Sequence, residues 1–155
     1  MGTVLNFNPR VMIVESFGSN TKSLHGHLSS LAAPIEILTA NDADSALARL
    51  QQERIDLLIV DTCLKGKMDG FDLCRAVRSA PLYREASIIL LLSGYLSLER
   101  SKGISAGADL LLHRPVVKEE LSKMIQLLLG VRAETAAIPR PAYNNFVESR
   151  LRSVS

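Results

Sequence analysis

A short apolar run that ends on a carboxylate constrains this chain more than any other feature. Residues 55–61 read Ile-Asp-Leu-Leu-Ile-Val-Asp, and the following segment up to Gly70 is rich in turn-forming residues. An apolar run of this length, with β-branched residues and a polar loop after it, is typical of a strand covered on both faces. Because ligand crevices in open parallel sheets lie beyond the carboxyl ends of the strands, Asp61 is a candidate functional residue. The alternative is an ordinary loop aspartate that stabilises a turn.

The alternation of strand and helix extends through residues 11–130. Apolar runs predict strands, and segments with apolar residues at helical spacing predict helices between them. Strands that alternate with helices through short connections favour a parallel sheet with helices on both faces, so the predicted fold is a doubly wound α/β three-layer sandwich. The expected strands are 11–14, 35–38, 55–61, 87–92 and 110–112; one expected helix carries Leu24, Leu28 and Leu31, and the others span 43–53, 70–79, 98–106 and 117–129.

Length and composition set the expected domain organisation. The chain has 155 residues, 47% of them hydrophobic, and no apolar run reaches the roughly 18 residues of a membrane span. We expect a leader at 1–10, one domain at 11–130, and a linker or helical extension at 131–155. The first ten residues lack a signal-peptide pattern and the two cysteines form no metal motif, so a cytoplasmic protein with free thiols is expected. The chain has no basic stripe with interleaved aromatics, which argues against direct nucleic-acid binding.

Polar residues follow four of the predicted strands. Glu15 and Ser16 follow the first strand, Asp61 ends the third, Ser93 follows the fourth, and Arg114 follows the fifth. The carboxyl ends of parallel strands share one edge of the sheet, so these side chains are expected to converge. Two acids, a hydroxyl and a cation at one edge are what a metal-assisted phosphoryl acceptor needs, with Asp61 as the nucleophile.

Mg²⁺ is the metal ion that this cluster predicts. A divalent cation would offset the repulsion between phosphoryl oxygens and carboxylates, and Mg²⁺ prefers oxygen ligands in octahedral geometry. The expected ligands are Asp61, Glu15 and the backbone carbonyl of Cys63.

Several segments, in this order and spacing, resemble the receiver domain of two-component response regulators. The resemblance spans about residues 11–130 and implies a flavodoxin-like (βα)5 fold with strand order 2-1-3-4-5. The matching segments are Val14-Glu15-Ser16, the run 55–61, Met68-Asp69-Gly70-Phe71-Asp72-Leu73-Cys74, Leu92-Ser93-Gly94, Ala106-Gly107-Ala108-Asp109 and Arg114-Pro115.

The resemblance also implies a function and partners. Asp61 would accept a phosphoryl group from a histidine kinase or a histidine phosphotransfer protein, while Ser93 and Arg114 would contact that group. The face formed by the fourth helix, the fifth strand and the fifth helix would bind a downstream protein or a second copy of the chain. Any enzymatic activity would be limited to the module's own phosphorylation and dephosphorylation. The chain would be a stand-alone receiver or part of a longer protein such as a hybrid kinase.

Four positions depart from the pattern of the resembled family. The family usually has a second acid after the first strand, where this chain has Ser16, a weaker or indirect metal ligand. Arg114 replaces the usual lysine with a planar guanidinium, Leu111 stands at the aromatic switch position, and Lys65 replaces a proline. If the metal is lost, Arg114 could simply pair with Asp61. The alternative function is therefore a pseudo-receiver that binds a partner without phosphorylation.

Overall fold

Five strands and five helices alternate along the chain in the computed structural model, which describes residues 8–16, 21–31, 34–94 and 97–130. For residues 21–23 only the backbone is described, and most of the expected leader and the whole of the expected extension at 131–155 lie outside the described residues. The elements are β1 (Arg10–Val14), α1 (Thr21–Ser29), β2 (Glu36–Ala40), α2 (Ala43–Gln52), β3 (Leu57–Asp61), α3 (Gly70–Ser79), β4 (Ser87–Leu92), α4 (Ser97–Ala106), β5 (Leu110–His113) and α5 (Lys118–Leu129).

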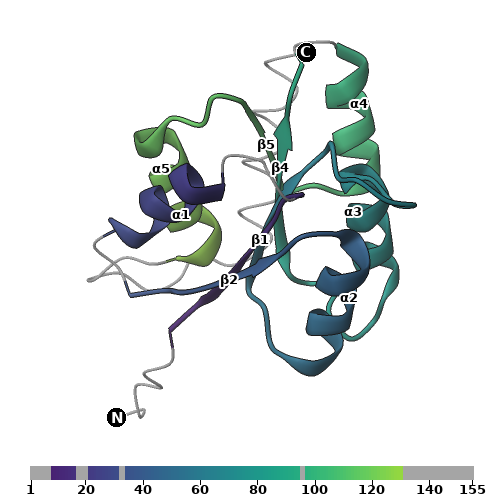
Figure 1. The fold of residues 1–155 in the computed structure, drawn as a ribbon, viewed down its shortest axis with the longest axis horizontal. Helices are drawn as coiled ribbons and strands as arrows, with labels where there is room; N and C mark the ends of the chain where they lie inside the picture. Colours follow the sequence, from purple (N-terminus) through teal and green to yellow (C-terminus); the bar gives the residue numbers. More distant parts are fainter. Residues whose placement is uncertain (1–7, 17–20, 32–33, 95–96, 131–155) are drawn as a thin grey trace.

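The strands form one parallel sheet in the order β2-β1-β3-β4-β5. Helices α1 and α5 cover one face, and α2, α3 and α4 cover the other (Figure 1). This arrangement confirms the predicted three-layer α/β sandwich and its strand order. None of the helices in the described ranges is long and apolar enough to cross a bilayer.

Alternate residues of each central strand feed two separate cores. Met12 and Val60 point to the layer of α2, α3 and α4, whereas Ile13 and Ile59 point to the layer of α1 and α5. All five residues of β3 and all six of β4 are buried. The apolar run before Asp61 is therefore a strand covered on both faces, as its composition predicts.

The start of α3 is fixed immediately after the loop that follows β3. Asp69 caps the helix and forms a capping box with Asp72, in which each side chain accepts a hydrogen bond from the other residue's backbone N–H at 3.0 Å or less. The Asp69 N–H bond is the main cause that lowers the pKa of the Asp72 carboxyl, and the Arg75 side chain lowers it further. The cap fixes where the loop returns to the sheet.

Most element boundaries agree with the sequence pattern within two residues, and two differences have clear causes. The third strand begins at Leu57 rather than at Ile55, because Asp56 accepts the Arg10 N–H through its side chain at 2.7 Å. The first helix ends at Ser29, so the prediction that it carries Leu31 is wrong: Leu31 follows the helix and packs against the core from there. The expected caps of this helix, Ser19 and Asn20, lie outside the described residues.

Gly70 and Gly26 supply a matched test of the close packing between the start of α3 and the end of β3. A Cβ at Gly70 would lie 2.3 Å from the backbone oxygen of Asp61 and 2.6 Å from Thr62 Cα, so Gly70→Ala should lower the free energy of unfolding by about 3 kcal/mol, the upper end of the overpacking range. A Cβ at Gly26, within α1, meets nothing within 4 Å, so Gly26→Ala should raise stability by about 0.5–1 kcal/mol. Urea denaturation followed by circular dichroism measures both changes. Equal stabilities for the two variants would contradict the close approach of α3 to the end of β3.

Candidate functional site

The carboxyl edge of the sheet gathers the polar residues that the sequence singled out. Glu15 and Ser16 follow β1, Asp61 ends β3, Ser93 follows β4 and Arg114 follows β5. Glu15 is 1% exposed and Asp61 is 7% exposed, so both carboxylates lie at the border between the core and solvent. The side chains of Glu15, Asp61 and Arg114 are in direct contact at this edge.

Arg114 bridges the two carboxylates with a single nitrogen. Its Nη2 atom donates to Glu15 Oε1 in a close contact and to Asp61 Oδ2 at 3.3 Å. The Glu15 side chain is fully buried and that of Arg114 is 26% exposed. A hydrogen-bonded pair of opposite charges offsets the desolvation of the buried carboxylate, which would be strongly unfavourable alone. We name the three residues Glu15, Asp61 and Arg114 the acidic corner.

The backbone that follows β3 fixes the orientation of Asp61. Its Oδ1 accepts the N–H of Cys63 at 2.9 Å, so one carboxylate oxygen is held by the loop and the other, Oδ2, faces Arg114. The Thr62 hydroxyl donates to the carbonyl of Leu91 in β4 at 3.1 Å and ties the loop to the neighbouring strand. This hydrogen bond was not predicted, because a threonine that follows an aspartate does not by itself indicate a contact with a neighbouring strand.

Ser16 and Ser93 make contacts away from the two carboxylates. Ser16 Oγ accepts the N–H of Lys65 at 2.9 Å, which links the loop after β1 to the loop after β3. Ser93 Oγ lies 3.2 Å from the sulfur of Cys63 and is exposed. The sequence suggested Cys63 for its carbonyl alone, so the contact of its thiol with Ser93 is a further feature of the site.

Leu111 packs closely against α4. Its Cδ2 atom lies 2.6 Å from the position that a Cβ on Gly103 would occupy, so Gly103 leaves the space that this leucine fills. Leu111 contacts the core on the side of α2, α3 and α4 and is only partly buried. Leu111 therefore packs against Gly103 at the position where the resembled family usually has an aromatic residue.

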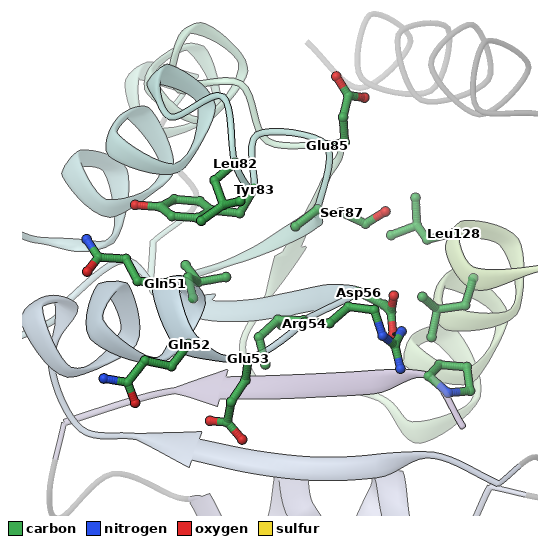
Figure 2. A pocket seen from close by; sticks show the side chains of 15 residues that line it. Gln51, Gln52, Glu53, Arg54, Asp56, Leu82, Tyr83, Glu85, Ser87 and Leu128 are labelled. Carbon is green, nitrogen blue, oxygen red and sulfur yellow. Dashed lines mark hydrogen bonds and ion pairs between the residues drawn. The ribbon is translucent and has the colours of Figure 1, made fainter. Parts of the chain in front are cut away.

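A separate hollow of about 670 Å³ lies at the opposite, amino end of the strands. Figure 2 shows Leu82 and Tyr83, from the connection between α3 and β4, on one side of it and Leu128 of α5 on another. Arg54 at its edge pairs with Asp56. This hollow shares no residue with the acidic corner, so it plays no part in the chemistry of that site.

Comparisons with known proteins agree with this geometry. The family model described as the response regulator receiver domain matches residues 11–126. The phosphate regulon transcriptional regulatory protein PhoB of Rhizobium meliloti is 32% identical over 121 residues, which cover 78% of this chain and 52% of PhoB. The response regulator PleD of Caulobacter vibrioides is 29% identical over 107 residues, which cover 69% of this chain and 23% of PleD. The chain thus spans between about a quarter and about half of the length of these relatives.

A solved structure is similar over nearly its whole length. The chemotaxis response regulator CheY4 of Vibrio cholerae superposes with a TM-score of 0.69 at 28% sequence identity, covering 79% of this chain and 99% of CheY4. The comparisons therefore support the family assignment for the sheet and its helices.

Receiver domains generally bind Mg²⁺ at their acidic phosphorylation site, and Mg²⁺ requires oxygen ligands in near-octahedral geometry. Oxygen atoms of both carboxylates in the acidic corner pair with the guanidinium of Arg114. The described residues include no group of three or more histidine, cysteine or acidic side chains that could hold a metal ion. As arranged, the donors do not fit a divalent cation, and the expectation of Mg²⁺ ligation by Glu15, Asp61, Ser16 and the Cys63 carbonyl stays a prediction.

The bridge itself can be measured through stability. Arg114→Gln leaves the buried Glu15 without its cation and should lower the free energy of unfolding by about 2 kcal/mol, less than for a fully buried pair because Arg114 is partly exposed. Adding Glu15→Gln to that variant should recover at least half of the loss, because the uncompensated charge is then gone. Arg75→Gln, which removes the exposed pair with Asp72, should cost about 0.5 kcal/mol or less. Additive effects of Arg114→Gln and Glu15→Gln in urea denaturation would contradict the bridge.

The two cysteines should differ sharply in reactivity. Both are free thiols, Cys63 exposed and Cys74 buried. Burial is the main cause that raises the pKa of the Cys74 thiol to about 11. At pH 8 only about one Cys74 in a thousand would be ionised, so a thiol-specific reagent should modify one thiol per folded chain quickly and both after denaturation. Cys63→Ser should abolish the fast reaction; a fast reaction that persists in this variant would contradict the burial of Cys74.

Proposed function

The chain belongs to the family of response regulator receiver domains, and from this premise we propose that it accepts a phosphoryl group on Asp61. The donor would be a phosphohistidine on a histidine kinase or on a histidine phosphotransfer protein. The observation that carries the proposal is the placement of Asp61 at the carboxyl end of β3, with Oδ1 held by the Cys63 N–H and Oδ2 turned toward a cation. The working module is residues 11–130.

The proposed reaction is a direct displacement at phosphorus. Asp61 Oδ2 forms a bond to the phosphorus atom while the bond between that phosphorus and the donor's imidazole nitrogen breaks. The imidazole leaves with the electron pair of the broken bond and takes up a proton from solvent. The product is an acyl phosphate on Asp61, and its hydrolysis by water returns the carboxylate and inorganic phosphate.

Arg114 and Ser93 are proposed to contact the transferred group. A guanidinium can donate two parallel hydrogen bonds to phosphoryl oxygens, and Arg114 is already within 3.3 Å of the accepting oxygen. The exposed hydroxyl of Ser93 lies just after the end of the neighbouring strand β4, beside the loop residue Cys63.

The proposed partners follow from the family and from the exposed surface. A histidine kinase or phosphotransfer protein would approach the carboxyl edge, where Lys65 and Lys67 are exposed and can attract an acidic surface. A downstream protein, or a second copy in a homodimer, would bind the face of α4, β5 and α5, where Leu98 and Val117 are exposed. We place the protein in the cytoplasm, without direct contact to nucleic acid or membrane. The module would work as a stand-alone receiver or within a longer protein such as a hybrid kinase.

A second candidate is a pseudo-receiver that binds its partner without phosphorylation. The observation that favours it is the bridge of Arg114 across Glu15 and Asp61, which neutralises part of the acidic corner before any phosphoryl group arrives. Leu111, which packs against Gly103, also stands at the position where the family usually has its aromatic switch residue. In this case Asp61 is a structural ion-pair partner.

Intact-mass spectrometry after incubation with a small-molecule phosphodonor, and separately with a phosphorylated phosphotransfer protein, distinguishes the two candidates. We expect one added phosphoryl group on the wild-type chain and none on Asp61→Asn, because the amide cannot act as the nucleophile. Asp44→Asn, which changes an exposed aspartate on α2, is the matched control and should still be modified.

The three possible outcomes have different meanings. An adduct that depends on Asp61 supports the receiver that works by phosphorylation. A folded wild-type chain that gains no adduct from either donor overturns it in favour of the pseudo-receiver, and an adduct that persists in Asp61→Asn would place the acceptor elsewhere.

A further inference from the structure

We propose that the guanidinium of Arg114 takes the place of a divalent cation in the acidic corner, so that Mg²⁺ and Arg114 compete for the same two carboxylates. In the resting protein the arginine holds this place, and Mg²⁺ binds only when Arg114 moves away. The inference concerns the unphosphorylated site, so it stands or falls independently of phosphoryl transfer to Asp61.

The position of Arg114 Nη2 carries the proposal. This one nitrogen contacts Glu15 Oε1 and Asp61 Oδ2, and it therefore lies between the two acids, where a cation that bridges them would have to lie. The Glu15 side chain is fully buried, which leaves it few other directions in which to find a cation. A guanidinium side chain carries a permanent positive charge in proteins.

Two other side-chain oxygen atoms near the corner accept hydrogen bonds from backbone N–H groups. Asp61 Oδ1 accepts from Cys63 N at 2.9 Å, and Ser16 Oγ accepts from Lys65 N at 2.9 Å. Glu15 Oε2 is buried and has no hydrogen-bond partner among the described residues. One carboxylate oxygen beside a guanidinium is a poor site for Mg²⁺, which needs six oxygen ligands and is repelled by the neighbouring positive charge.

Removal of the arginine charge should therefore create a metal site. In Arg114→Gln, Glu15 Oε1 and Asp61 Oδ2 lose their cation, and together with Glu15 Oε2 they offer three oxygens with two negative charges. Arg114→Lys keeps a positive charge, which is concentrated on one nitrogen. The Mg²⁺ affinity of this variant should therefore lie between those of the wild type and Arg114→Gln.

Isothermal titration with Mg²⁺, without any phosphodonor, tests the competition. We expect Arg114→Gln to bind one Mg²⁺ at least about tenfold more tightly than the wild type, because it lacks a repelling charge beside the carboxylates. The matched control is Arg84→Gln, since Arg84 lies in the connection between α3 and β4 at the other end of the sheet and its charged group is 3.9 Å from Glu85. This control loses the same charge and should bind Mg²⁺ as weakly as the wild type. Equal Mg²⁺ affinity in the wild type and Arg114→Gln overturns the proposal.

A second measurement on the wild type covers the case in which Arg114→Gln does not fold. The Nε–H signal of Arg114 in ¹⁵N-labelled protein, assigned by its loss in Arg114→Lys, reports whether the guanidinium stays in the corner during a Mg²⁺ titration. The proposal predicts either no change, because Mg²⁺ does not bind, or a change that saturates together with Mg²⁺ binding, because the arginine leaves. The opposite result is Mg²⁺ binding that saturates and shifts the carboxyl carbon signals of Glu15 and Asp61 while the Arg114 signal stays unchanged. This result would overturn the proposal.

Discussion

Burial of β3 on both faces is the constraint on which the rest of this structure depends. Its five residues lie between a layer of two helices and a layer of three, and its neighbours β1 and β4 are nearly as enclosed. A strand in this position can become polar only where it leaves the core, and Asp61 stands at that point. The rigidity of the site follows, because the strand fixes the Cα of Asp61 while the loop and the start of α3 pack directly against its carbonyl.

The same burial makes charge compensation necessary at the carboxyl edge. Glu15 follows β1 directly and its side chain is enclosed, so its charge must be balanced from within the protein or by a bound cation. Arg114 meets this need from the far side of β4, and one side chain thereby links the ends of β1, β3 and β5 across the sheet. The contact is thus as much a part of the architecture as of any chemistry that takes place there.

The sequence predicted the fold well because the signals were local and strong. The apolar run that ends at Asp61 and the capped helix from Gly70 to Ser79 were placed correctly, and the order of polar strand ends named the members of the acidic corner. What could not be predicted was which side chains meet. Ser93 contacts Cys63, and Ser16 contacts the backbone of Lys65, because rotamers and loop paths decide contacts that spacing alone leaves open. The end of the first helix before Leu31 was missed for the same reason, since an apolar residue just beyond a helix can still reach the core.

Of the departures near the acidic corner, Ser16 changes the charge balance and Arg114 does not. The resembled pattern has two acids after the first strand, the acceptor aspartate and a lysine, so three carboxylates face one ammonium and a divalent cation balances the remaining two charges. Here Ser16 removes one carboxylate, and two acids face one guanidinium, which leaves a single negative charge. A divalent cation would overcompensate this corner, whereas a phosphoryl group or an acidic partner surface would add negative charge beside a cation that is already in place. Ser16 is therefore the departure that changes the charge balance, because the loss of an acid reduces the negative charge that a metal would offset, whereas Arg114 keeps the positive charge of the usual lysine.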